Sequence, residues 1–380
     1  MAVALVNGRI LVDGAFVEGR ALLVEGDRIA AILADREVAA DTARHDLDGG
    51  MLVPGFIDSQ VNGGGGVLFN DAPTVEAIAA IGAAHRRFGT TGFLPTLISD
   101  DLAVVRAGVA AVDAAMAAGV PGVLGIHIEG PFLNVDRKGI HAPEKIRALD
   151  EDGFAAVTGL RHGRTLITLA PEQTQPAMVR RLADAGLIVA AGHTDGSYRE
   201  IRDALDNGLT GFTHLFNAMS PLGSREPGAV GAALEDEAAW CGLIVDGRHV
   251  DPVTMRLALR CKPVDRFMLV TDAMPSVGMV HKSFMLQGHR ITVVDGVCVN
   301  EDGTLAGSDL DMARAVRNAV KMLGIDVPTA IAMASLSPAR FLGMDADRGR
   351  IAPGLAADLV LMGDDLHVRG SWIAGRYLPG

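Results

Sequence analysis

Residues 165–215 read TLITLAPEQTQPAMVRRLADAGLIVAAGHTDGSYREIRDALDNGLTGFTHL. Short apolar runs in this stretch alternate with two segments of helical pattern, Met178–Ala185 and Ser197–Asn207. Continuous apolar strands separated by helices are typical of a parallel sheet that helices cover on both faces. The stretch therefore predicts repeated strand–helix units.

The same alternation continues on both sides of this stretch and gives eight strand-like runs. They are Gly55–Ile57, Gly92–Leu94, Val123–Ile128, Thr165–Leu169, Ile188–Ala191, Gly211–Leu215, Leu243–Val245 and Met268–Val270. Eight such units predict a closed α/β barrel of the (β/α)8, or TIM barrel, class. A doubly wound nucleotide-binding sheet is less favoured, because no Gly-x-Gly-x-x-Gly follows a first strand. We interpret the glycine run 63–66 as a tight turn, because it lacks the Lys-Ser/Thr of a phosphate loop.

Both ends of the chain have a different pattern, in which short strands are broken by turn residues such as Asn7-Gly8 and Gly375-Arg376. Strands this short are marginal in isolation. We therefore expect the two ends to pair into one small β-sandwich domain, residues 1–52 with 346–380, beside a barrel of residues 53–345.

The composition excludes several functional classes. The 380 residues are 49% hydrophobic and carry a formal net charge of −12, without a long basic run, so we expect no nucleic-acid partner. No apolar run is long enough for a membrane span, and no signal peptide is evident. The three cysteines share no close spacing, which favours reduced thiols and a cytoplasmic protein.

Polar residues gather where the predicted barrel strands end, which is where barrel enzymes carry their active sites. These residues are Asp58, Gln60, Glu129, His193, His214, His249 and Asp272. A lone histidine there is as often a core residue, but a joint placement of this kind points to a site. Glu129, His193 and His214 form a two-histidine, one-carboxylate set that suits Zn2+ or Fe2+.

Several longer motifs carry a resemblance to a known family. In order they are Pro54-Gly-Phe-Ile-Asp58, His127-Ile-Glu-Gly-Pro131, Ala191-Gly-His-Thr194, Thr213-His-Leu-Phe-Asn-Ala-Met219, Val270-Thr-Asp-Ala273, Leu305-Ala-Gly-Ser308 and Ile351-Ala-Pro-Gly-Leu-Ala-Ala-Asp-Leu-Val360. The chain resembles the amidohydrolase superfamily and, within it, the family of N-acetylglucosamine-6-phosphate deacetylases. The resemblance spans nearly the whole chain.

The family pattern differs from the wider superfamily after the first strand. Many superfamily members carry His-x-His there and bind one ion of a metal pair, whereas this chain has Gln60 and Asn62. Neutral amides are poor ligands for zinc or iron, so we expect a vacated second metal site. One divalent metal per chain, Zn2+ or Fe2+, should remain.

The resemblance also implies roles for residues around the metal. Asp272 would move the proton between the attacking water and the departing amine, and His141 would orient and polarise the acetyl carbonyl. Asn217, Ala218, Arg225 and His249 would hold the sugar phosphate, with one cation supplied across the interface of a homodimer. From the residues alone, Arg225 could equally pair with Glu226, and His141 could be a solvated loop residue.

The function that these expectations imply is metal-dependent removal of the acetyl group from N-acetyl-D-glucosamine 6-phosphate, which yields acetate. A deacetylase for N-acetylgalactosamine 6-phosphate or another N-acyl sugar is the first alternative, because no residue that contacts the sugar 4-hydroxyl can be identified. A hydrolase of cyclic amides or N-acyl amino acids is less favoured. A catalytically retired barrel that acts as a binding protein is the alternative outside enzymes.

Overall fold

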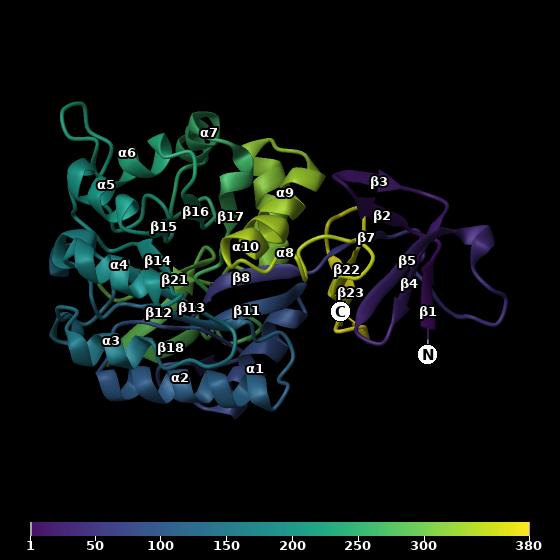
Figure 1. The fold of residues 1–380 in the computed structure, drawn as a ribbon, viewed down its shortest axis with the longest axis horizontal. Helices are drawn as coiled ribbons and strands as arrows, with labels where there is room; N and C mark the ends of the chain where they lie inside the picture. Colours follow the sequence, from purple (N-terminus) through teal and green to yellow (C-terminus); the bar gives the residue numbers. More distant parts are fainter. Residues whose placement is uncertain (1, 380) are drawn as a thin grey trace.

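The computed structural model describes residues 2–379. A barrel with its helices forms the larger part, and a smaller all-β part lies to one side of it (Figure 1). The smaller part contains strands from both ends of the chain, so the first and last segments of the sequence lie side by side there.

Eight parallel strands form the barrel, in the order of the chain. They are β8 (Phe56–Val61), β11 (Thr90–Leu97), β12 (Gly125–Glu129), β13 (Arg164–Leu169), β14 (Ile188–Ala191), β15 (Leu209–Phe212), β16 (Trp240–Leu243) and β17 (Phe267–Leu269). A parallel bridge joins Val61 at the end of β8 to Ala273, in the segment that follows β17, and brings the two edges of the sheet together. The predicted barrel is therefore confirmed. Seven of the strands overlap the predicted runs closely, whereas β16 begins three residues before the run Leu243–Val245 and shares only Leu243 with it.

Helices cover the outside of the barrel and connect its strands (Figure 1). They are α1 (Val75–Arg86), α2 (Leu102–Ala117), α3 (Glu151–Val157), α4 (Pro176–Asp184), α5 (Tyr198–Asp206), α6 (Gly228–Glu235), α7 (Pro252–Cys261), α8 (Met312–Asn318), α9 (Val327–Ala334) and α10 (Leu336–Phe341). Their starts follow local chemistry. Ser197, for example, accepts a hydrogen bond from the backbone N–H of Glu200, whose side chain bonds back in a capping box.

The two chain ends build two sheets. One has the order β5-β4-β1-β6, with β1 (Ala2–Val6), β4 (Arg20–Glu25), β5 (Arg28–Ala34) and β6 (Ala43–Asp46). The other has the order β24-β23-β22-β7-β2-β3, with β2 (Arg9–Val12), β3 (Ala15–Val17), β7 (Met51–Pro54), β22 (Leu359–Met362), β23 (Val368–Ile373) and β24 (Arg376–Pro379). They enclose a hydrophobic core of their own, and β7 extends this part of the structure to Pro54.

A further sheet, which no pattern in the sequence predicts, follows the last barrel strand. It is an antiparallel meander of β18 (Ser283–Leu286), β19 (His289–Val294), β20 (Val297–Val299) and β21 (Leu305–Ser308). A small hairpin of β9 (Gly63–Gly64) and β10 (Val67–Leu68) follows the first barrel strand. The two glycines between them have positive φ, 60° at Gly65 and 84° at Gly66, so this run is the tight turn that we expected.

None of the helices in residues 2–379 is both long and apolar enough to cross a membrane.

Candidate metal centre and active site

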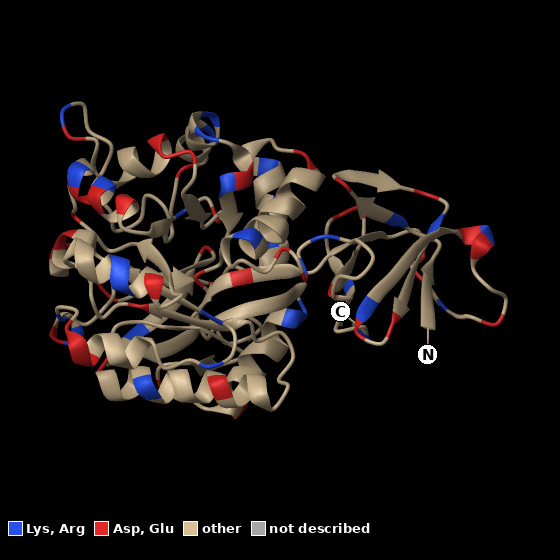
Figure 2. Cartoon of the chain, in the orientation of Figure 1, with Lys and Arg blue, Asp and Glu red and all other residues tan. Residues whose placement is uncertain are grey.

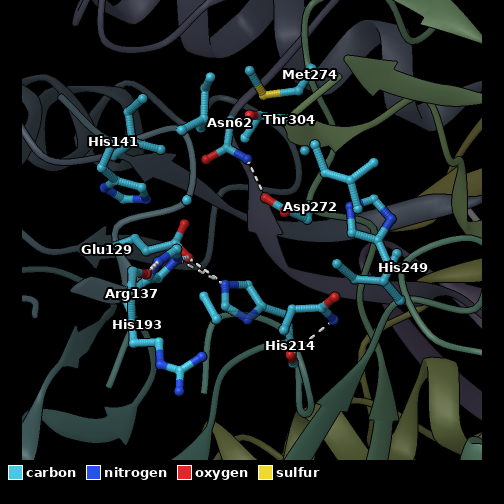
Figure 3. Close-up of a pocket in the computed structure, with 18 of the residues that line it drawn as sticks. Asn62, Glu129, Arg137, His141, His193, His214, His249, Asp272, Met274 and Thr304 are labelled. Atoms are coloured by element: carbon cyan, nitrogen blue, oxygen red, sulfur yellow. Dashed lines mark hydrogen bonds and ion pairs between the residues drawn. The ribbon is translucent and has the colours of Figure 1, made fainter. Parts of the chain in front are cut away.

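A pocket of about 380 Å³ opens at the carboxyl ends of the barrel strands. This volume lies within the ordinary range for small-molecule sites. Glu129 is the last residue of β12, and His193, His214 and Asp272 follow the ends of β14, β15 and β17. All four line the pocket together with His141 on a loop after β12 (Figure 3).

Three of these side chains converge on one point. The Nε2 atoms of His193 and His214 lie 3.2 and 2.9 Å from Oε1 of Glu129, and 3.1 Å from each other. All three residues are buried. In the described part of the chain, no other group of His, Cys, Asp or Glu side chains meets the geometry of a possible metal site.

The donor set fits a divalent metal. Nδ1 of His193 donates to the carbonyl oxygen of Arg137 at 2.8 Å, which leaves the Nε2 lone pair for an ion. Burial alone would raise the pKa of Glu129, but His193 and His214 hold it well below its usual range, so the carboxylate stays charged. Two imidazoles and one carboxylate leave coordination positions open for water and substrate.

The backbone turns sharply where the site residues leave their strands. His193, His214 and Asp272 have positive φ values of 49°, 34° and 52°. Residues other than glycine rarely adopt this conformation, and it is concentrated at functional sites. These three residues, whose side chains enter the mouth of the barrel, thus share this unusual backbone conformation.

Asp272 lies on the opposite side of the pocket from His141 (Figure 3). Its Oδ1 accepts a hydrogen bond of 2.6 Å from Nδ2 of Asn62. Burial and the nearby charge of Glu129 raise the pKa of Asp272. A buried carboxylate with a raised pKa, close to the metal ligands but not bonded to them, has the properties of a general base and acid.

His141 is buried at the wall of the pocket. Its Nδ1 lies 3.1 Å from the backbone nitrogen of Ser99 and 2.8 Å from the hydroxyl oxygen of Ser99. Burial lowers the pKa of His141 to about 3, with a further contribution from His193, so the ring is neutral at pH 7. The uncharged ring still has one N–H group and can donate a hydrogen bond through it.

Gln60 and Asn62 occupy the expected positions beside the metal ligands. Nε2 of Gln60 lies 3.2 Å from both carboxylate oxygens of Glu129, and Nδ2 of Asn62 bonds to Asp272. Both amides thus direct N–H donors, not oxygen lone pairs, at the carboxylates. These N–H groups bond to carboxylate oxygens of Glu129 and Asp272 that a second cation would need as ligands.

Three of the four residues predicted to hold the substrate phosphate lie in the pocket, and the fourth does not. His249, Asn217 and Ala218 line the pocket, and Nδ1 of His249 bonds to Asp246 at 2.6 Å. Arg225 does not line it, because it lies in an exposed loop between β15 and α6. This loop projects away from the barrel (Figure 1), and a basic and an acidic position lie side by side in it (Figure 2).

Glu172 is a functional residue that the sequence motifs do not identify, and it helps to hold His193 in place. Glu172 accepts hydrogen bonds from the side chains of Thr194 and Asn134 and from the backbone of Asp195, at 2.9 Å for Asn134 and 2.7 Å for Asp195. It thereby ties the segment that follows His193 to Asn134, whose backbone N–H donates to the carbonyl oxygen of His193 at 3.0 Å. Glu172 follows the fourth predicted strand, so its position could have drawn attention to it.

Comparisons with known proteins assign the chain to a family. The Amidohydrolase family profile matches residues 51–378, and the chain belongs to this family. The resemblance that the motifs indicate is therefore confirmed, and the class of protein is a hydrolase of amide bonds built on a TIM barrel.

Within the family, the chain is similar to deacetylases of amino-sugar phosphates. N-acetylgalactosamine-6-phosphate deacetylase of Shewanella sp. (strain ANA-3) is 41% identical over 98% of this chain and 95% of its own. The crystal structure of N-acetylglucosamine-6-phosphate deacetylase from Pasteurella multocida matches with a TM-score of 0.97 and 35% identity, over 100% of both chains. A mutant of N-acetyl-D-glucosamine-6-phosphate deacetylase from Mycobacterium smegmatis, solved in complex with N-acetyl-D-glucosamine-6-phosphate, gives a TM-score of 0.90 and 32% identity over 100% and 99%.

Proposed function

We propose that this protein hydrolyses the acetamide of N-acetyl-D-glucosamine 6-phosphate to D-glucosamine 6-phosphate and acetate. The observation that carries the proposal is the convergence of three metal-binding side chains with Asp272 and His141 around one pocket. The three unpaired cysteines fit a cytoplasmic enzyme of amino-sugar catabolism. A retired binding protein would have no need to keep this set.

A divalent ion held by Glu129, His193 and His214 would supply Lewis-acid polarisation and lower the pKa of a water molecule. Asp272 accepts the proton of the attacking water and delivers it to the amine nitrogen as the C–N bond breaks. His141 donates a hydrogen bond to the acyl oxygen, where negative charge develops. Asn62 holds the Asp272 carboxylate in place for both proton transfers.

We expect about one tightly held metal ion per chain, because the side-chain amides of Gln60 and Asn62 present N–H donors where a second site would need ligands. Elemental analysis after dialysis measures this ratio directly. A second ion per chain that survives dialysis would contradict the argument.

The phosphate group needs cations that the pocket of one chain does not supply. The described residues that line the pocket include three carboxylates, Glu129, Asp136 and Asp272, but one arginine and no lysine. That arginine, Arg137, already pairs with Asp195 at 2.6 Å. A dianionic substrate would therefore meet a site with too little positive charge.

We propose that Arg225 of a second copy supplies the missing charge in a homodimer. Its loop is exposed, and Leu222 in the same loop is 60% exposed. The following helix α6 packs against α7, on which Val253 and Leu257, one turn apart, are 54% and 55% exposed. Exposed apolar side chains next to an exposed arginine are typical of an interface between subunits.

Arg225→Ala should lower kcat/KM for the phosphorylated sugar by about ten- to a hundredfold, because it removes a charge-assisted contact of about 1.5–3 kcal/mol. The unphosphorylated sugar serves as the matched control and should be affected little. An equal loss for both sugars would make Arg225 a structural residue.

Mixed dimers test whether Arg225 acts across the interface. Asp272→Asn and Arg225→Ala chains, denatured and refolded together, should regain activity, because one site then combines an intact Asp272 with the arginine of the other chain. If Arg225 serves its own pocket, the mixture should stay as inactive as its parts.

The epimer at the sugar 4-position defines the second candidate function. The relative from Shewanella, at 41% identity, acts by its name on N-acetylgalactosamine 6-phosphate. Acetate release from both 6-phosphates, measured as kcat/KM side by side, separates the two functions. A clear preference for the galactosamine epimer would replace the first candidate by the second.

A further inference from the structure

The meander β18–β21 packs directly against the two segments that carry Ser99 and His141. Leu286, Ile291 and Ala306 of this sheet are buried in one apolar cluster with Ile98, and Ile140 packs against the same cluster. Ile98 and Ile140 are the residues immediately before Ser99 and His141. The meander therefore supports the wall of the pocket that carries His141, and its last strand also reaches Asp272, whose carbonyl oxygen accepts from the backbone N–H of Ser308 at 2.8 Å.

One side chain of the meander bonds to both segments. Gln287, in the turn between β18 and β19, donates from Nε2 to the carbonyl oxygen of Ser99 at 3.2 Å. Its Oε1 accepts from the backbone N–H of Ala142 at 3.1 Å. Gln287 and Gly288 have positive φ values of 47° and 86° and form the two-residue turn of this hairpin.

The contacts of Ser99 decide which nitrogen of His141 carries the proton. A backbone N–H can only donate, and that of Ser99 points at Nδ1 of His141 at 3.1 Å. Nδ1 must therefore accept, and the neutral ring carries its hydrogen on Nε2. The Ser99 hydroxyl, at 2.8 Å, adds a second donor to the same nitrogen.

We propose that Gln287 and Ser99 are positioning residues that hold His141 with its Nε2–H toward the acyl oxygen of the substrate. The inference rests on the proposed function, because His141 matters only if an acyl oxygen is bound beside it. The amide of Gln287 fixes the spacing between the Ser99 and Ala142 backbones, and Ser99 fixes the ring between them. Gln287 thus acts through His141, and the rest of the meander carries Gln287 to this place.

Gln287→Met keeps the length of the side chain and removes both hydrogen bonds. In the metal-loaded enzyme it should lower kcat about tenfold, while KM changes little, because a displaced donor weakens stabilisation that the transition state needs most. Gln287→Glu can accept from Ala142 but, when ionised, cannot donate to Ser99. Its kcat should lie between that of the wild type and that of Gln287→Met. Arg290→Ala, at an exposed position on β19, is the matched control and should keep full kcat.

A double-mutant cycle separates positioning from general support of the fold. If Gln287 acts through His141, Gln287→Met should cause no further loss of kcat in a His141→Ala background. An equal tenfold loss in both backgrounds would overturn the proposal, as would an unchanged kcat in the single variant.

The tautomer of His141 can be measured directly, without an activity assay. In the metal-loaded protein with 15N-labelled histidine, the His141 signals, assigned by their loss in His141→Gln, should show a bare Nδ1 and a protonated Nε2. Gln287→Met should alter these signals and Arg290→Ala should not. A proton on Nδ1 would overturn the inference even in an active enzyme. The expected tautomer in a protein that releases no acetate would instead locate the failure in the proposed function.

Discussion

Asp272→Asn should keep its metal and bind substrate, yet lose at least about two orders of magnitude in kcat. The substitution preserves the shape of the side chain and its position beside Asn62, but removes the basic oxygen that takes a proton from water. The measurement is steady-state acetate release, with metal content determined on the same preparation.

The pH profile gives a second result for the same variant. Because burial and Glu129 raise the pKa of Asp272, a base at this position is lost as the pH falls through that raised value. The wild-type rate should therefore fall on the acidic side, and the variant should lack this limb. Near-normal turnover with the limb intact would rule out the assignment, and loss of the metal would make Asp272 a ligand.

His193→Ala and His214→Ala should each lose the metal while the barrel stays folded. Each removes one imidazole from a site with only three protein ligands. Because loss of a residue that merely orients a ligand costs about 10- to 100-fold in affinity or activity, loss of a ligand should cost more. Elemental analysis, circular dichroism and acetate release measure the three properties.

An exposed histidine provides the matched control for these variants. His281 lies outside the pocket, and His281→Ala should retain metal and activity. Full metal content in both His193→Ala and His214→Ala would exclude them as ligands. If His193→Ala does not fold, His193→Gln replaces it in the metal analysis, because glutamine keeps a polar side chain of similar length.

The barrel could be predicted because its strands are buried on both faces and therefore read as continuous apolar runs. Every residue of β11 and β12 is buried, as this pattern requires. Glu129, His193, His214 and Asp272 could be found for a related reason. They follow strand ends, and in parallel sheets all such ends meet at one side.

The meander β18–β21 could not be predicted in the same way. Its strands have only three to six residues and, except in β20, include exposed positions, so they do not form the continuous buried runs of the barrel strands. Gln287 meets Ser99 across 188 residues of sequence, so no local pattern connects the two. Contacts of this kind depend on the closed barrel, which brings distant loops to one rim.

The placement of Arg225 marks a different limit. Sequence motifs associate it with the phosphate site, whereas within one chain it lies in an exposed loop away from the pocket. A residue that acts in the site of another subunit is recognised only when the assembly is considered. The sequence neighbours of Arg225 do not reveal such a role, because an exposed arginine next to Glu226 is also typical of a solvated surface.

The most direct test of the account is acetate release from N-acetyl-D-glucosamine 6-phosphate by protein stripped of metal and then reloaded with one equivalent of Zn2+ or Fe2+. We predict no release from the stripped protein, restored release after reloading, and much slower release from the sugar without its phosphate. Undiminished release from the metal-free protein, or no release from the reloaded protein with either epimer, would contradict a metal-dependent deacetylase of amino-sugar phosphates.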